Sequence, residues 1–141
     1  MSKIVDKSVK LAFDLFPDAY SKRKKHQPFH FAFLFKKNRL VSIGQNNTTK
    51  ESAKALYFAQ RYNLKQQKKY PFIHAEIDAV SKAFGKIYVD NSFSIVSLRV
   101  SQGFILKNAN PCKACNSVMK ALNIDCVYYS DAHGRIVKEE L

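Results

Sequence analysis

The chain has 141 residues, of which 46% are hydrophobic and 25% charged, so it can form one domain with its own core but not a second catalytic domain. No apolar run reaches the about 18 residues that a membrane-spanning helix needs, and the amphipathic N-terminus lacks a hydrophobic signal core, so we expect a cytoplasmic protein without a membrane partner. Its 24 Lys and Arg against 11 acidic residues give a net charge of +13, which predicts a polyanionic partner such as nucleic acid or a phosphorylated substrate.

The N-terminal segment predicts an amphipathic helix. Apolar side chains recur at helical spacing over residues 4–16, and Pro17 is expected to end the helix. A basic run follows at residues 21–26. We therefore assign residues 1–28 to a basic helical extension of a single domain that spans residues 1–141.

The middle of the chain predicts a hairpin and two helices. The aromatic and β-branched runs 29–35 and 40–45, separated by a polar turn, are typical of paired strands. Helical spacing returns from residue 49 to about residue 62, after a threonine cap. A further helix is expected to begin beside His74 and to end at Gly85.

The C-terminal part predicts two more strands around a last helix. Residues 93–100 are rich in β-branched and aromatic side chains, and residues 104–106 are expected to extend that strand after a bulge at Gly103. Pro111 is expected to open the next helix. A strand at residues 126–130 then leads through a short glycine-containing turn to a final strand.

This order of elements indicates a layered α/β fold with a five-stranded mixed sheet and helices on its faces. The final connection decides one pairing. A parallel return needs a crossover of at least about 10 residues, and the chain after residue 130 is too short for both a crossover helix and a strand. We therefore predict that the last two strands are antiparallel.

Two short segments, His74-Ala75-Glu76 and Pro111-Cys112-Lys113-Ala114-Cys115, contain the residues suited to metal chemistry. Cysteines three apart in the first turn of a helix project to one side, where the helix N-terminus favours thiolates. With His74 they form a three-ligand zinc set that leaves the fourth tetrahedral position open, as in catalytic sites, and Glu76 is suited to carrying protons. The alternative for the cysteines is a thiol redox pair in a reducing compartment. The remaining histidines have no ligand-like spacing and are expected at the surface or in turns: His26, His30 and His133.

These two segments resemble the H-x-E and P-C-x-x-C motifs of the cytidine deaminase-like superfamily. The resemblance extends from about residue 29 to the C-terminus. It implies the layered fold of that family, a zinc cofactor and hydrolytic deamination of a nucleobase. It also implies that His74, Cys112 and Cys115 are the metal ligands and that Glu76 is the catalytic acid and base.

The resemblance further implies the residues around the substrate. The family's asparagine near the sugar corresponds to Asn46, with Asn47 as the alternative. Ala75 and Pro111 are expected beside the base. Phe72 either stacks on the base or acts as a hydrophobic staple of the helix that follows it.

The basic loop with Lys65, Lys68 and Lys69 either follows a phosphate backbone or is a solvated basic surface. We predict deamination of cytosine to uracil in single-stranded nucleic acid. The charge suits a polymer, and the short final hairpin is similar to the branch of the family that contains the free cytidine deaminases and several bacterial toxin deaminases. The alternatives are a free cytidine, deoxycytidine or nucleotide deaminase, an adenine deaminase and an inactive zinc-stabilised nucleic acid binding module. The free cytidine deaminases usually have a third cysteine where this chain has His74. A homo-oligomer remains an open alternative.

Overall fold

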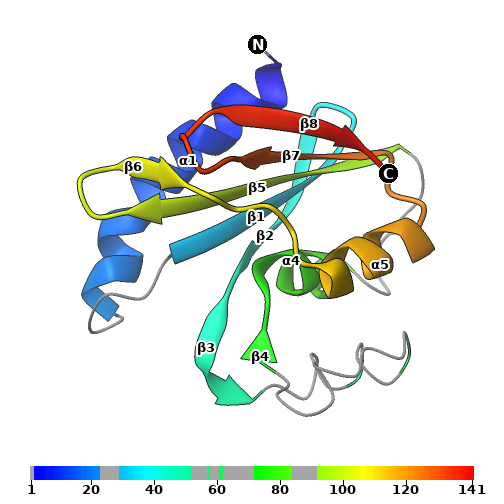
Figure 1. The fold of residues 1–141 in the computed structure, drawn as a ribbon, viewed down its shortest axis with the longest axis horizontal. Coiled ribbons are helices and arrows are strands. Elements are labelled where there is room, and N and C mark those ends of the chain that lie inside the picture. Colours follow the sequence, from blue (N-terminus) through cyan, green and yellow to red (C-terminus); the bar gives the residue numbers. More distant parts are fainter. Residues whose placement is uncertain (1, 23–28, 52–56, 58–60, 62–71, 84–91) are drawn as a thin grey trace.

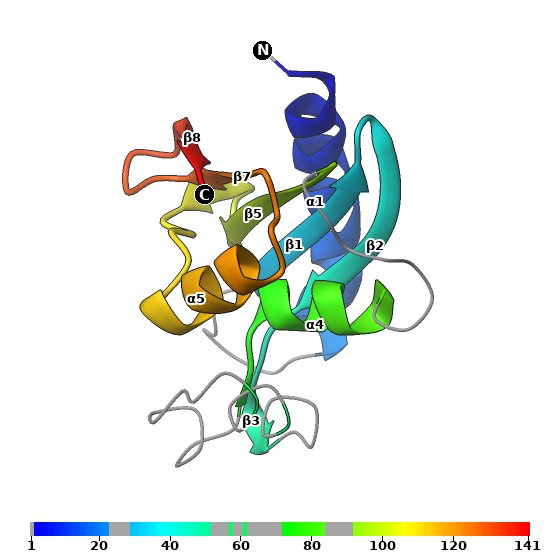
Figure 2. The ribbon, with the colours of Figure 1, turned by 90° about the vertical axis from the view of Figure 1, so that its right-hand side faces the viewer.

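A mixed β-sheet separates two helical layers in the computed structural model of the protein, which describes residues 2–22, 29–51, 57, 61, 72–83 and 92–141. Helix α1 (Lys3–Lys22) covers one face of the sheet, and α4 (Ala75–Ala83) and α5 (Lys113–Ala121) cover the other (Figures 1 and 2). The predicted layered α/β fold is therefore confirmed as a three-layer arrangement.

The central sheet has the strand order β2-β1-β5-β7-β8, and the short strand β6 also pairs with β5. Strands β5 and β7 are parallel, whereas β7 and β8 are antiparallel, so the predicted direction of the last strand is correct. A turn closed by a 2.8 Å hydrogen bond from the Asp131 N–H to the Arg135 carbonyl makes this short connection. The five strands of the path are β1 (Phe29–Lys36), β2 (Arg39–Gln45), β5 (Phe93–Ser101), β7 (Cys126–Ser130) and β8 (Ile136–Glu140).

Both faces of the central strands are buried, which explains why β1 is apolar throughout instead of alternating. Successive side chains point to opposite faces of the sheet. Phe31, Phe33 and Phe35 pack in the cluster that includes α1, while Ala32 and Leu34 pack in the cluster that includes α4 and α5. The sheet thus contributes to two separate hydrophobic cores, and the second core lies beneath the residues predicted to bind metal.

Helix α1 continues through Pro17 to Lys22, so the expected end of the helix at Pro17 is wrong. Proline in a helix interior removes one backbone hydrogen bond and crowds the preceding turn. Packing of the next turn offsets that cost, because Ala19 is buried and the Tyr20 ring lies 6.0 Å from the Phe29 ring. Among the described residues no helix, α1 included, is both long and apolar enough to cross a membrane.

Two other expected elements differ in the structure. Residues 104–106 do not extend β5, because Gly103 (φ 87°) and Phe104 (φ 58°) reverse the chain and β6 (Ile105–Lys107) returns antiparallel to β5. Residues 49–51, which were expected to begin a helix, form the end of strand β3 (Asn47–Glu51). This strand pairs with β4 (Phe72–Ile73). Of its later residues only Tyr57 and Arg61 are described, both as helix.

Helix α4 approaches strand β2 so closely that only glycine fits between them. A Cβ placed on Gly44 would lie 2.1 Å from the Ala75 carbonyl oxygen and 2.4 Å from the Ala79 nitrogen. Polar contacts hold the same interface, since the Ser42 hydroxyl donates to the Ala79 carbonyl at 2.6 Å and the Gln45 N–H donates to the Asp78 carboxylate at 3.0 Å. The sheet thereby sets the position of the first turn of α4.

Gly44→Ala is expected to displace α4 and to weaken zinc binding as well as the fold. Overpacking of this kind costs about 1–3 kcal/mol, and here the neighbouring atoms are backbone and cannot rotate away. Urea denaturation gives the stability, and metal analysis after dialysis gives the zinc content.

Gly103→Ala is the matched control for this substitution. Its positive φ makes alanine unfavourable by about 1–2 kcal/mol, but the added Cβ meets only a side-chain atom of Ile105 at 3.9 Å. We expect Gly103→Ala to lower stability and to retain zinc. Equal zinc contents in the two variants would contradict the role assigned to Gly44.

Candidate metal centre

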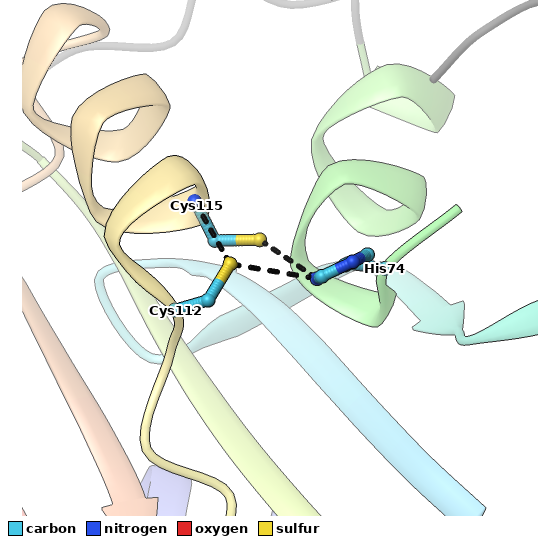
Figure 3. A group of neighbouring side chains, drawn as sticks. All are labelled: His74, Cys112 and Cys115. Atoms are coloured by element: carbon cyan, nitrogen blue, oxygen red, sulfur yellow. Dashed lines mark hydrogen bonds between the residues drawn. The ribbon is translucent and has the colours of Figure 1, made fainter. Parts of the chain in front are cut away.

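The three predicted metal ligands meet where the N-termini of α4 and α5 converge (Figure 3). His74 directly precedes α4, and its carbonyl accepts the first helical hydrogen bond from the Asp78 N–H at 2.9 Å. Cys112 is the N-cap of α5, whose first helical residue is Lys113, two positions after Pro111. The Cys112 sulfur accepts the Cys115 N–H at 3.4 Å. Both helix N-termini therefore direct positive dipole ends at the thiols, which favours thiolates.

The donor atoms have the spacing of a zinc site. His74 Nδ1 lies 3.6 Å from the Cys112 Sγ and 3.5 Å from the Cys115 Sγ, and all three donor atoms lie within 4.8 Å of one another. Tetrahedral zinc, with bonds of about 2.3 Å to sulfur and about 2.0 Å to nitrogen, separates these atoms by about 3.6 Å. One nitrogen and two sulfurs also form a donor set that zinc prefers. The cluster therefore fits a zinc site, and three protein ligands are the number typical of catalytic zinc.

The protonation states differ between the two cysteines. A hydrogen bond from the Cys115 thiol, aided by His74 and the Cys115 N–H, lowers the pKa of Cys112 to about 4 although burial opposes the shift. The hydrogen bond to Cys112 and burial raise the pKa of Cys115 well above its ordinary value. The hydrogen bond with Cys112 raises the pKa of His74. Without metal, the pair holds one thiolate and one thiol near neutral pH.

Glu76 lies in the first turn of α4 and is buried, with 2% of its surface exposed. Its Oε2 atom accepts a hydrogen bond from the Ser97 hydroxyl at 3.4 Å. Its Oε1 atom is buried and has no hydrogen-bond partner within the part of the chain that the structure describes. Because a buried unpaired carboxylate oxygen is costly, Oε1 is suited to a group that the protein itself does not provide.

The structure brings most of the expected substrate residues to this side of the sheet. Ala75 and Pro111 are buried next to the ligands His74 and Cys112, and Asn46 is buried just after β2. The Asn46 side-chain oxygen accepts the His30 N–H at 3.1 Å. The backbone of Phe72 forms β4, but its side chain lies outside the described part of the structure. The loop residues Lys65, Lys68 and Lys69 also lie outside the described part.

His30 is not at the surface or in a turn, as its spacing suggested, but is buried in β1 with 7% of its surface exposed. Its Nε2 makes a short hydrogen bond with the Ser97 hydroxyl and lies 3.8 Å from Glu76 Oε2. A polar residue in an otherwise apolar strand was the available signal for His30. Ser97 had an equivalent signal in β5. His133, in contrast, lies in the exposed turn after β7, and His26 lies outside the described residues.

Comparison with solved structures identifies the class of fold. One match is a 1.6 Å crystal structure of cytidine deaminase from Burkholderia pseudomallei, with a TM-score of 0.56, 20% identity and coverage of 93% of this chain and 91% of that chain. At this identity the match establishes the fold. A comparison with curated proteins found no match.

The sequence itself identifies the family. Residues 4–131 match the family described as the cytidine and deoxycytidylate deaminase zinc-binding region, and the chain therefore belongs to that family of zinc-dependent deaminases. The matched range includes most of α1 as well as the metal centre. The predicted family, its zinc cofactor and its enzymatic class are thereby confirmed.

Zinc binding is expected to release protons and to weaken as the pH falls. Zinc requires two thiolates and a neutral imidazole, so at pH 7 the Cys115 thiol must lose about one proton. His74 also releases protons when zinc binds, because its raised pKa keeps part of it protonated. Below neutral pH protonation of His74 competes with the metal. Calorimetry in two buffers of different ionisation enthalpy measures the protons released. Equal binding heats in both buffers, together with a pH-independent affinity, would contradict the assigned protonation states.

Proposed function

We propose that the protein is a hydrolytic deaminase that converts cytosine to uracil within single-stranded nucleic acid. The main support for this reaction is Glu76 Oε1, which is buried and has no hydrogen-bond partner among the described residues, near a histidine and two cysteines suited to zinc. A carboxylate at this position can accept a proton from water and return it to the base.

In this reaction Glu76 is the acid and base, and His74, Cys112 and Cys115 hold the metal. Zinc, when bound, supplies the Lewis acidity that makes water nucleophilic near neutral pH. Glu76 accepts the proton that the attacking water loses and donates it to the ring nitrogen next to the carbon that carries the amine. The same carboxyl then carries the second water proton to the departing nitrogen. One water is consumed, and the products are uracil and ammonia.

The surrounding residues are proposed to bind the nucleoside. Asn46 contacts the sugar, Ala75 and Pro111 line the site of the base, and Phe72 stacks on it. The burial of Ala75 next to the ligand His74, and of Asn46 just after β2, supports these roles. A target base must lie outside a stacked helix to reach such a buried carboxylate, which favours a single-stranded substrate.

The position of Arg99 favours a substrate that carries phosphate. It lies opposite His30 in the register and two residues after Ser97, so its side chain extends from the same face of β5 as the Ser97 hydroxyl. Its Nε is buried and has no hydrogen-bond partner among the described residues. An arginine donor near the reaction centre, in a chain of net charge +13, suits a phosphate of the substrate.

Lys65, Lys68 and Lys69 are proposed to extend the contact to further phosphates. A free nucleotide is the second candidate, because Arg99 alone would serve a single phosphate. The free thiols Cys112, Cys115 and Cys126 suit a reducing compartment, and we propose a cytoplasmic location.

Glu76→Ala is expected to retain zinc and to lose turnover by at least about 100-fold, because the group proposed to transfer protons is removed. Metal analysis and a deamination assay on cytosine-containing oligonucleotides measure the two effects. Glu140→Ala, at an exposed position of β8, is the matched control and should leave both unchanged. Zinc loss or full activity in Glu76→Ala would contradict the assignment.

Substrate length is tested with cytidine, deoxycytidine, their monophosphates, single-stranded DNA and RNA, and the adenosine equivalents. We expect conversion in cytosine oligomers, and affinity should fall steeply with salt, by about 0.7 log units per log unit of salt for each phosphate contact. Arg99→Gln should remove about one phosphate contact and thereby reduce this salt dependence by about 0.7 log units per log unit of salt. Conversion of monomers alone would show a free nucleoside or nucleotide deaminase.

A further inference from the structure

Behind the catalytic carboxylate lies a chain of buried polar groups that metal binding does not require. Ser97 is fully buried, and its hydroxyl lies 3.4 Å from Glu76 Oε2 and 3.3 Å from the Ala109 carbonyl oxygen. His30 Nε2 makes a short hydrogen bond with the same hydroxyl. Polar groups in an otherwise apolar core are costly unless they are mutually satisfied, so this chain is a specific arrangement.

The chemistry of the groups determines the direction of the hydrogen bonds. The Glu76 carboxylate can only accept, and the Ser97 hydroxyl has a single proton to donate. Burial lowers the pKa of His30, so its ring is neutral near pH 7 and carries one N–H. If Nε2 holds this proton, His30 donates to Ser97 and the Ser97 proton is free to reach an acceptor. A charged carboxylate is a stronger acceptor than the Ala109 carbonyl, which favours Glu76 Oε2.

We propose that His30 and Ser97 are positioning residues that hold Glu76 Oε2 and thereby leave Oε1 for water and the base. The observed asymmetry of the carboxylate supports this: Oε2 is hydrogen-bonded, whereas Oε1 is buried and unpaired within the described part of the chain. A fixed rotamer matters because proton transfer requires the carboxylate oxygen within hydrogen-bond reach of the reacting atoms. This inference rests on the proposed role of Glu76.

The backbone holds the other end of the chain. The His30 N–H donates to the Asn46 side-chain oxygen at 3.1 Å, and the Asn46 N–H donates to the His30 carbonyl at 3.2 Å. His30 therefore connects the residue proposed to contact the sugar with the residue proposed to transfer protons. Strand β1 lies between β2 and β5, so His30 can contact Asn46 just after β2 on one side and Ser97 of β5 on the other.

Ser97→Ala tests the positioning role. We expect kcat to fall about 10- to 100-fold, with an unchanged zinc content and a KM within about twofold, because a hydrogen bond to a charged group is lost and no substrate contact is removed. Ser94→Ala is the matched control, since Ser94 lies on the same strand but points to the opposite face, and it should leave kcat unchanged. An unchanged kcat in Ser97→Ala would overturn the proposal.

His30 is tested by two substitutions that differ in their donor. The amide of His30→Gln can replace the Nε2–H donor, whereas His30→Met removes it at a similar size. We expect kcat to fall at least about 10-fold further in His30→Met than in His30→Gln. Equal losses in the two variants would overturn the donor role of Nε2.

An NMR measurement tests the contact without activity. The ¹⁵N spectrum of histidine-labelled protein, with the His30 signals assigned by the His30→Gln variant, should show a neutral ring with the proton on Nε2. Ser97→Ala and Glu76→Gln should both shift the Nε2 signal. A shift with Ser97→Ala alone would show that the hydroxyl donates to Ala109 instead and would overturn the proposal. If the contact is confirmed but Glu76→Ala remains active, the proposed function fails while the hydrogen-bond chain stands.

Discussion

The close contact between α4 and β2 is the constraint on which the site depends. Because Gly44 lacks a side chain, the first turn of α4 lies directly on the sheet, and this places His74 and Glu76 at once. His74 faces the cysteines of α5, while Glu76 is buried beside Ser97 of β5. The parallel pair β5 and β7 in turn fixes α5, which connects these strands. One helix–sheet contact thus positions both a metal ligand and the buried carboxylate two residues after it.

The electrostatics of the site favour thiolates at the metal centre. Two helix N-termini converge on the cysteines, and the lowered pKa of Cys112 shows that one thiolate is stable even before metal binds. The Glu76 carboxylate is buried, so its oxygens depend on hydrogen bonds from the protein or from bound groups. One hydrogen bond, from the Ser97 hydroxyl that His30 also contacts, compensates Oε2. Oε1 is left without a hydrogen-bond partner within the part of the chain that the structure describes.

Local patterns predicted the elements whose stability is mainly local. The hairpin of β1 and β2, the helix after His74, the helix near Pro111 and the final antiparallel pair are all present. One failed expectation concerns a proline that tertiary packing keeps within a helix, and another concerns a local turn that reverses the chain. Pro17 stays within α1 because the following turn packs on the sheet, and β6 turns back because Gly103 and Phe104 adopt positive φ. Neither effect can be read from periodicity, which reports faces and not partners.

Residue type and spacing are enough to identify His74, Cys112 and Cys115 as zinc ligands and to assign the family, and the deaminase motifs contain Glu76 as well. The environment of Glu76, in contrast, depends on the fold. His30 and Ser97 lie 46 and 21 residues away from it in the sequence, and they reach it because β1 and β5 are neighbours in the sheet. Spacing motifs describe groups that one element holds together. Contacts between strands depend on register, which the packing of both sheet faces sets.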